Sequence, residues 1–548
     1  MPPEPSRKLS AVIAGLAFGA SATSLVNGFA LDDIPIILKN ARIHTLALPW
    51  TYFGQTYWPP DQGPALYRPL TILGFALEWL AGGGAPFFFH LVSLLLYVAG
   101  ALAVFWLARQ VLSLNLAFIA SALFAVHPVH VEAVGNVVGQ SELWVGLLLP
   151  LAVGWYLRAR TGGPIGVRDG AIITLLYLAA LCFKEHAVML PALLVLAEFL
   201  LVRDPTPARA RVARVLPLLL ALGAVLVAFW FIRTNVTGGM VGRDILPAFR
   251  TGGTPTRLFT ALGVVPQWVR LLLWPAHLSA DYNPQELSIL TAFGLRPFLG
   301  VMVILGFLGL AAGTARRHPV IAFGVLWVGV TLFPVSNLLL PTGILLAERT
   351  FLLPSVGMML ALAGAAAAWG PASTVGSTAR LRPAAVLLGM VILAGLGWSA
   401  IRQRVWRDNP TLFAQTALDA PRSYKARAAH AVMLFEAGSD SAGEREYRTA
   451  ISLYDQDPNI IADLGNWYLG KKRWQDALDM YTLVLAQVPD HWTATSRSIL
   501  SLMNLDRLEE AQRLATVAAQ RGDKGAAEKL AYVNKLLADR KEPKPGQR

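Results

Sequence analysis

The strongest constraint on the fold is a series of long apolar runs that extends from near the N-terminus to about residue 400. The first run, residues 9–29, reads LSAVIAGLAFGASATSLVNGF. A helix of about 20 apolar residues crosses a hydrocarbon core about 30 Å thick. Because lipid offers no partner to backbone polar groups, helices are the structures that such runs form there. The sequence therefore predicts an all-α, polytopic membrane domain.

Composition agrees with this prediction and excludes a soluble enzyme. The 548 residues are 55% hydrophobic and 15% charged, with a mean hydropathy of +0.50. The formal charge of +13 would fit nucleic acid, but the arginines gather in short loops between apolar runs, as topology signals do. The single Cys182 excludes an intramolecular disulfide and argues against a cysteine-based metal site.

Hydropathy predicts about eleven spans. They lie near 9–29, 87–108, 111–126, 142–157, 170–183, 187–202, 215–232, 295–314, 319–337, 352–369 and 383–400. Arg7 and Lys8 favour a cytoplasmic N-terminus, and alternation then puts five basic loops on that same side. The run 259–276 carries Arg270 within it and is predicted to be an interfacial or re-entrant helix. A cleaved signal peptide over 1–22 is the alternative for the first run, which extends beyond that point.

Polar residues that interrupt apolar sequence fall on one predicted face, opposite the basic loops. An aspartate inside the hydrocarbon core would cost about 3 kcal/mol, so Asp32 and Asp33 lie just outside the first span. The other candidates from the loops of this face are Tyr67, Arg68, His127, His130, Glu132, Glu142, Lys184, Glu185, His186, Glu348 and Arg349. Acids, histidines and cations that converge from several loops predict an active site at the membrane surface. The alternative for the acidic pair is two solvated charges at a helix end.

The histidine-rich loop and the cations each have two interpretations. His127, His130 and Glu132 have a spacing that could ligate zinc, but Pro128 interrupts the helix and no HExxH motif is present. Hydrogen bonding, to substrate or to neighbouring loops, is therefore preferred to metal binding.

The cations either form interfacial ion pairs, as Lys184 would with Glu185, or meet the phosphate of a lipid. The same two interpretations apply to Arg68 and Arg349, and a guanidinium suits bidentate contact with phosphate best.

A repeat pattern marks the polar C-terminal part, 401–535, as a second domain. Gly465, Tyr468, Ala477 and Tyr481 fit the small, aromatic, small, aromatic pattern of a tetratricopeptide, and Pro489 closes the unit. A unit about 34 residues earlier keeps most of these positions, and a later third unit is degenerate. An α-solenoid able to hold an extended peptide is predicted, with a plain helical bundle as the alternative. Residues 536–548 are predicted to be a basic tail.

The motifs of residues 1–400 and the repeats together carry a resemblance. The chain resembles the GT-C glycosyltransferases and, more closely, the transmembrane-and-tetratricopeptide O-mannosyltransferase family. The runs concerned are DDIPIILKN, YRPLT, HPVHVEAVGNVVGQSEL, FKEHAVMLP, LLLWPAHLSADYN and FPVSNLLLPTGILLAERTFLLPS. The chain departs from the family in its repeat count and in a shorter loop between Asp33 and Tyr67.

The resemblance implies an inverting glycosyltransferase, GT-C in fold, that uses a polyprenyl-phosphate-linked sugar, mannose by analogy. Asp32 would be the base, and Asp33 would position it or bind sugar. The leaving phosphate would be held by Arg68, Lys184 and Arg349, with His186 and His127 as further donors. Glu132 and Glu142 would bind sugar hydroxyls or orient the cations. A lipid-linked phosphate is already a good leaving group, so no cofactor is required and no divalent metal is expected.

The expected location is an integral membrane protein, of the inner membrane if bacterial, with a cytoplasmic N-terminus and the repeats on the outer or periplasmic side. Membrane lipids, the lipid-linked donor and a protein or peptide acceptor presented by the repeats are the expected partners. The alternatives are a lipid or cell-envelope glycan acceptor, a noncatalytic membrane-anchored scaffold, and a transporter.

Overall fold

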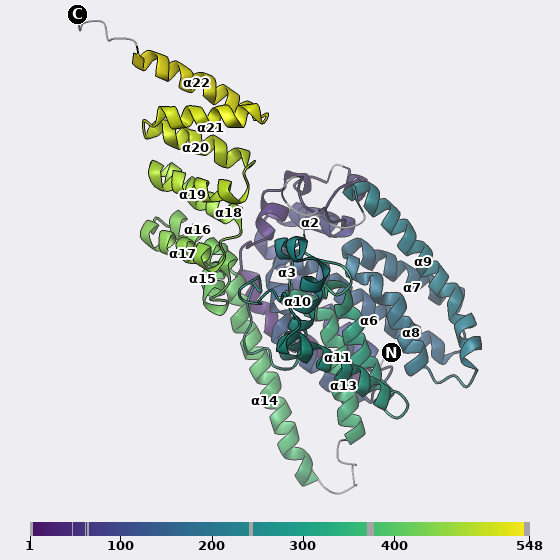
Figure 1. The fold of residues 1–548 in the computed structure, drawn as a ribbon. Coiled ribbons are helices and arrows are strands. Elements are labelled where there is room, and N and C mark those ends of the chain that lie inside the picture. The colour runs from purple at the N-terminus through teal and green to yellow at the C-terminus, as the bar shows by residue number, and fades with distance from the viewer. Residues whose placement is uncertain are drawn as a thin grey trace, which may run out of the picture. The chain divides into compact units, whose positions relative to one another are not determined.

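The computed structural model describes residues 4–46, 48–60, 62, 65–239, 245–369 and 378–541 and consists there of helices and loops, with no strand in those ranges (Figure 1). The predicted all-α class is confirmed. The chain divides into two compact units, Met1–Ala420 and Pro421–Arg548. The sequence placed this division near residue 400; in the structure helix α15 (Asn409–Asp419) still belongs to the first unit.

The first unit is an integral membrane domain by the length and apolarity of its helices. Seven helical segments of the described chain are long and apolar enough to cross a membrane. They are Ser6–Val26, Pro86–Ala108, Val137–Thr161, Ala208–Thr237, Leu295–Thr314, Glu348–Trp369 and Pro383–Trp406. An eighth is obtained if the pair Leu114–Ala125 and Pro128–Gly135, bent by 49°, is taken as one span.

The prediction of about eleven spans is too high for the described part of the chain. Three of the expected spans are the short helices α7 (Val167–Phe183), α8 (Leu190–Leu200) and α12 (Pro319–Leu332). The 11 residues of α8 are about 16 Å long, which is half a hydrocarbon core. The run 259–276 falls in helix α10 (Pro247–Leu273), which is not among the seven.

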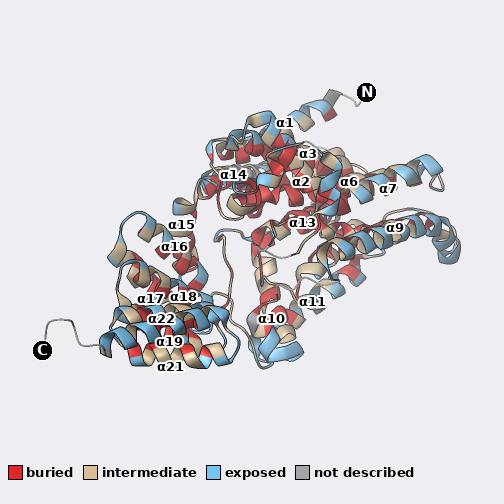
Figure 2. Cartoon of the chain, turned by 90° about the horizontal axis from the view of Figure 1, so that it is seen from above, coloured by how far each residue is buried: buried red, intermediate tan, exposed pale blue. Residues whose placement is uncertain are grey.

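Burial separates inner helices from peripheral ones. Helices α3 (Pro86–Ala108), α6 (Gln140–Thr161) and α13 (Leu352–Trp369) are largely buried, whereas α9 (Ala208–Thr237) is mostly exposed along its length (Figure 2). Close approach at the centre depends on small residues. A Cβ on Gly324 of α12 would lie 2.3 Å from the carbonyl oxygen of Gly357 on α13, so glycine is required for these two helices to meet.

The segment after the first span folds as a compact layer, which the sequence did not predict. It contains the π-helical turn η2 (Ile34–Leu38), the 3₁₀ helices η3 (Ala41–Ile43) and η4 (Pro49–Gly54), and helix α2 (Pro69–Gly82). We call residues 27–85 the outer segment. Its own apolar core includes Ile36, Tyr52, Tyr57, Ile72 and Phe75. The described residues of this segment therefore pack around an apolar core of their own.

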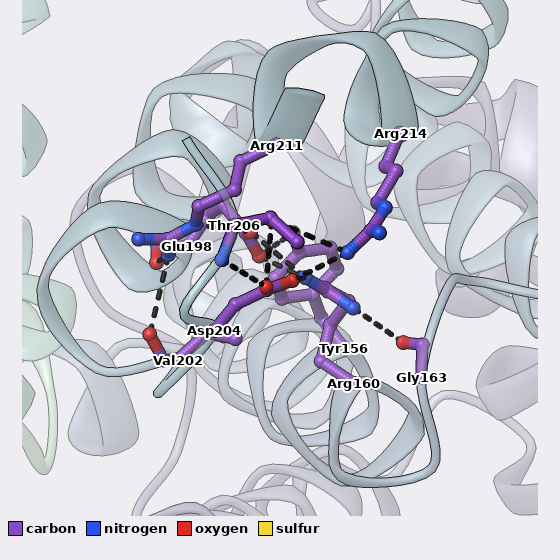
Figure 3. A network of polar contacts seen from close by, with 9 residues as sticks. All are labelled: Tyr156, Arg160, Gly163, Glu198, Val202, Asp204, Thr206, Arg211 and Arg214. Atoms are coloured by element: carbon purple, nitrogen blue, oxygen red, sulfur yellow. Dashed lines mark hydrogen bonds and ion pairs between the residues drawn. The ribbon is translucent and has the colours of Figure 1, made fainter. Parts of the chain in front are cut away.

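A network of ion pairs joins the ends of α6, α8 and the start of α9 (Figure 3). Glu198 accepts hydrogen bonds at 3.0 Å from Nε of Arg160 and from Nε of Arg211, and at 2.7 Å from Oη of Tyr156. Asp204 accepts at 2.8 Å from Nη2 of Arg160 and from Nη1 of Arg214. Within this network, Arg160 lies about 27 Å along α6 from Glu142 in the first turn of that helix, and we call the network the basic end.

Loss of the central carboxylate of the basic end should destabilise the first unit. Glu198→Gln leaves Arg211, whose side chain is 12% exposed, without a charged partner, and it leaves Arg160, 2% exposed, with Asp204 alone. We expect a loss of about 3 kcal/mol or more. Thermal unfolding of the purified protein in detergent measures the change. The matched control is Arg214→Gln, whose pair with Asp204 is solvent-accessible and should contribute about 1 kcal/mol or less. Equal small losses in both variants would contradict the expectation.

The second unit is a series of antiparallel helix pairs. The pairs are α16 (Tyr424–Glu436) with α17 (Asp440–Leu453), α18 (Pro458–Gly470) with α19 (Trp474–Gln487), and α20 (Trp492–Asn504) with α21 (Leu508–Gln520), followed by α22 (Lys524–Lys541).

The small and aromatic positions predicted for the central repeat occupy the core of this unit. Tyr468, Ala477 and Tyr481 are fully buried. A Cβ on Gly465 would lie 2.8 Å from the ring of Tyr481, which explains the small residue there. Residues 536–541, expected in the tail, continue α22, and 542–548 lie outside the described residues.

Candidate active site

The acidic pair follows an unusual stretch of backbone. Helix α1 (Glu4–Ser21) continues into the 3₁₀ helix η1 (Ala22–Val26). Leu31 then adopts a left-handed conformation, φ 53°, and its N–H donates to Oδ1 of Asn409 at 2.7 Å. The π-helical turn η2 begins directly after Asp33. Positive φ at a branched residue and π turns are both enriched at functional sites.

Asp33 anchors the backbone of two segments. Its buried carboxylate accepts from the N–H groups of Ala30 at 3.4 Å, Val137 at 3.2 Å and Val138 at 2.9 Å. Burial raises the pKa of Asp33 to about 7, although these N–H groups lower it. With both oxygens engaged by backbone, Asp33 holds the outer segment against 137–138.

Asp32 has the opposite environment. Its side chain is partly exposed, and its carboxylate makes no hydrogen bond to any residue that the structure describes. Burial raises the pKa of Asp32, and the nearby cations Arg349 and Arg68 oppose that shift. The two adjacent acids therefore differ: Asp33 is fixed by backbone donors, and Asp32 is available to accept a proton.

Each of the three predicted cations is paired with a carboxylate. Arg349, in the 3₁₀ helix η9 (Glu348–Phe351), contacts Glu132 with its guanidinium, and its backbone N–H donates to Oε2 of Glu132 at 2.9 Å. Because Glu132 is buried in the short helix α5 (Val131–Gly135), it fixes Arg349 at both backbone and side chain.

Lys184, which caps the C-terminal end of α7, pairs with Glu142 in the first turn of α6. His186 lies on the same carboxylate, with Nδ1 3.6 Å from Oε2. Burial lowers the pKa of Lys184 to about 8; Glu142 opposes this shift, and the positive charges of Arg68 and Arg349 add to it.

Arg68 precedes α2 and donates from Nε to Oε2 of Glu185 at 3.0 Å. Its Cζ lies 4.9 Å from the centre of the Tyr57 ring. Burial acts to raise the pKa of Glu185, yet Arg68 holds it below its ordinary value. Electrostatic interactions connect Arg68, Lys184, Arg349 and Asp32, so these groups form one charged centre.

Four other predicted site residues bond within the protein. His130 contacts Oη of Tyr97 at 2.9 Å and Oγ of Ser355 at 2.8 Å with its two nitrogens. His127 contacts the carbonyl of Leu272 at 3.1 Å, and its other nitrogen accepts from N–H of Val129.

The remaining two are Tyr67 and Glu348. Tyr67 donates to the carbonyl of Phe53 at 2.9 Å, and Glu348 accepts from N–H of Ser279 at 2.6 Å and from Oη of Tyr282 at 2.5 Å. The structure thus gives all four residues contacts that hold elements around the charged centre. In the described residues no group of three or more His, Cys, Asp or Glu side chains is placed to hold a metal ion.

Sequence reasoning missed Tyr57. This tyrosine is 2% exposed, packs on Arg68 and interacts electrostatically with Asp32, Asp33 and Arg349. It lies in the aromatic-rich stretch WTYFGQTYW, where no single residue stands out.

The raised pKa of Asp33 makes stability depend on pH. The folded state keeps the Asp33 proton up to about pH 7, whereas the unfolded chain releases it near 3.8, so this group's stabilisation is lost as pH rises between those values. Asp33→Asn lacks the ionisation. We expect the difference in melting temperature, Asp33→Asn minus wild type, to become more positive between about pH 5 and about pH 8. Thermal unfolding in detergent across this range tests it; parallel curves would contradict it.

The fold and the charged centre define a polytopic helical membrane protein with a preorganised acid and paired cations at one end of its helices. Its sequence is similar to protein O-mannosyl-transferases: 26% identical to mouse TMTC3 over 508 residues, covering 85% of this chain and 53% of that protein. It is 25% identical to human TMTC1, covering 83% and 56%. Over a shorter stretch of 322 residues it is 35% identical to Drosophila melanogaster Tmtc2, covering 55% and 33%.

The resemblance that the motifs indicated is confirmed by these similarities, and the chain spans about half the length of the first two relatives. No protein-family model matches the chain. Among solved structures, the oligosaccharyltransferase of Archaeoglobus fulgidus with a tethered acceptor peptide matches with a TM-score of 0.41 and 14% identity, covering 82% of this chain and 59% of that one.

Proposed function

We propose that this chain is an inverting glycosyltransferase that moves a sugar from a polyprenyl-phosphate-linked donor to a hydroxyl of a protein acceptor. The observation that carries the proposal is Asp32, a partly exposed residue whose carboxylate has no hydrogen-bond partner in the described chain and interacts electrostatically with two arginines that other carboxylates hold in place. The relatives' names, protein O-mannosyl-transferases, supply mannose as the proposed sugar.

The charges of the site suit the bonds that form and break during sugar transfer. The acceptor oxygen forms a bond to the anomeric carbon, the bond from that carbon to the phosphate oxygen breaks, and the lipid phosphate leaves with the electron pair. The cations Arg68, Lys184 and Arg349 stabilise the negative charge that develops on the phosphate, so no acid has to protonate the leaving group. The paired carboxylates keep the cations oriented before substrate arrives.

The acceptor hydroxyl needs a base, and Asp32 has the right properties. A pKa raised above the ordinary aspartate value brings the carboxylate closer to the working pH, where a base is most effective. One base opposite one leaving group gives inversion at the anomeric carbon without a covalent intermediate. Asp33 acts through the backbone that positions Asp32.

Replacement of the base should slow transfer strongly without unfolding the protein. We expect Asp32→Asn to lower kcat by about 10²–10⁴. In the wild type, activity should fall as pH drops through the raised pKa of Asp32, so the acid limb lies above about 3.9. Transfer of labelled mannose from polyprenyl-phosphate-mannose, scored separately in protein and lipid fractions, measures both effects.

The matched control for this assay is Asp169→Asn, which removes a charge from the start of α7 but keeps an acceptor for Nε1 of Trp155. Its transfer activity should equal that of the wild type. Full activity of Asp32→Asn would refute the assignment of the base, and label in the lipid fraction alone would refute the protein acceptor.

We further propose that the charged centre faces the outer side of the membrane, with the N-terminus cytoplasmic and the repeats outside. Seven arginines gather near the basic end, as positive residues do on the cytoplasmic side: Arg158, Arg160, Arg168, Arg203, Arg209, Arg211 and Arg214. The repeats would then present an extended peptide to Asp32.

Reporter fusions test this orientation. A reporter active only outside the cytoplasm should give signal when fused after residue 541 and none when fused in the loop at 163–166. The arginines at the C-terminal end of the last span and directly after it, Arg402, Arg404 and Arg407, favour the opposite result for the first fusion. Signal from the fusion at 163–166 alone would show the opposite orientation in the membrane and would refute the proposed topology.

A further inference from the structure

Tyr57 occupies a fixed position in the wall of the charged centre. Its backbone N–H donates to the carbonyl of Leu66 at 2.7 Å, which closes the loop between η4 and α2. Its ring packs in the core of the outer segment and faces the Arg68 guanidinium, 4.9 Å from Cζ to the ring centre. The side chain therefore has no need of its hydroxyl to stay in place.

The Tyr57 hydroxyl is buried and has no hydrogen-bond partner among the described residues. Two neighbouring buried tyrosines differ: Tyr52 donates to the carbonyl of Thr45 at 2.6 Å, and Tyr67 donates to that of Phe53 at 2.9 Å. A buried polar group without a partner is unfavourable and uncommon in native proteins. An unpaired hydroxyl beside a charged centre therefore indicates a group that binds there.

The adjoining groups define the chemistry of that ligand. Arg68 uses Nε for Glu185, and its Nη1 and Nη2 make no hydrogen bond to any residue that the structure describes. A free pair of guanidinium nitrogens matches two oxygens of a phosphate. Burial raises the pKa of Tyr57, so its hydroxyl keeps its proton and acts as a donor at any physiological pH. Two adjacent donors, one of them cationic, favour an anion over a neutral sugar hydroxyl.

We propose that Tyr57 is a substrate-binding residue whose hydroxyl donates a hydrogen bond to a phosphate oxygen of the lipid-linked donor, beside Arg68. The inference rests on the proposed function, because that function supplies the lipid phosphate. It assigns to the outer segment a direct part in holding the leaving group, and it distinguishes Tyr57 from the tyrosines that only support the loop.

The test uses the full chain in detergent and two probes, farnesyl phosphate and farnesol, which differ only in the phosphate. The affinity of each probe is measured by titration calorimetry for the wild type, Tyr57→Phe and the control Tyr52→Phe. We expect the wild type to prefer farnesyl phosphate, and Tyr57→Phe to bind it about tenfold more weakly with farnesol unchanged. Tyr52→Phe should keep the wild-type ratio of affinities.

Thermal unfolding separates binding from support of the fold. Tyr57→Phe removes a hydroxyl without a partner, so its melting temperature should equal or exceed that of the wild type. Tyr52→Phe should melt at a lower temperature, because it loses hydrogen bonds to Thr45 and Arg42.

Every other outcome refutes a specific part of the proposal. If the wild type prefers farnesyl phosphate and Tyr57→Phe binds it equally well, or if Tyr57→Phe melts at a lower temperature, the role of Tyr57 is refuted and the proposed function stands. If the wild type binds farnesyl phosphate no better than farnesol, the lipid-phosphate donor is refuted, and the role of Tyr57 with it.

Discussion

The charged centre depends on the pairing of every predicted cation with a carboxylate from another part of the chain. Arg349 pairs with Glu132, Lys184 with Glu142, and Arg68 with Glu185. Buried charges are tolerated only when paired, and removal of one partner leaves an uncompensated charge. These pairs therefore connect α5 and the first turn of α6 with the short segments directly before α2, α8 and α13. They determine where the cations lie before any substrate arrives.

The two adjacent acids, Asp32 and Asp33, have different surroundings and therefore different chemistry. Asp33 receives three backbone N–H groups and is enclosed, whereas Asp32, one residue earlier, is partly exposed and interacts electrostatically with Arg68 and Arg349. Asp33 anchors the turn and thereby fixes the backbone from which the Asp32 side chain extends. Preorganisation of this kind lets a carboxylate act as a base while the surrounding positive charge remains directed at a leaving group.

Sequence reasoning succeeded where hydropathy and charge define a residue's place. Hydropathy and charge singled out Asp32, Arg68, Lys184 and Arg349 at the ends of apolar runs, and in the structure these groups interact electrostatically. It did not predict the contacts of His130, because an imidazole that bonds Tyr97 and Ser355 in a helical core has the same sequence signature as one that faces a ligand. The number of spans was also too high, because apolar composition does not reveal that α8 ends after 11 residues.

The sequence by itself determined an all-α membrane domain and a C-terminal series of helix pairs, since these follow from hydrophobic periodicity. Only the tertiary structure decided the partners. Whether a carboxylate is anchored like Asp33 or available like Asp32, and whether a tyrosine hydroxyl is bonded like Tyr52 or unpaired like Tyr57, depends on backbone brought from distant segments. Local sequence does not encode that proximity.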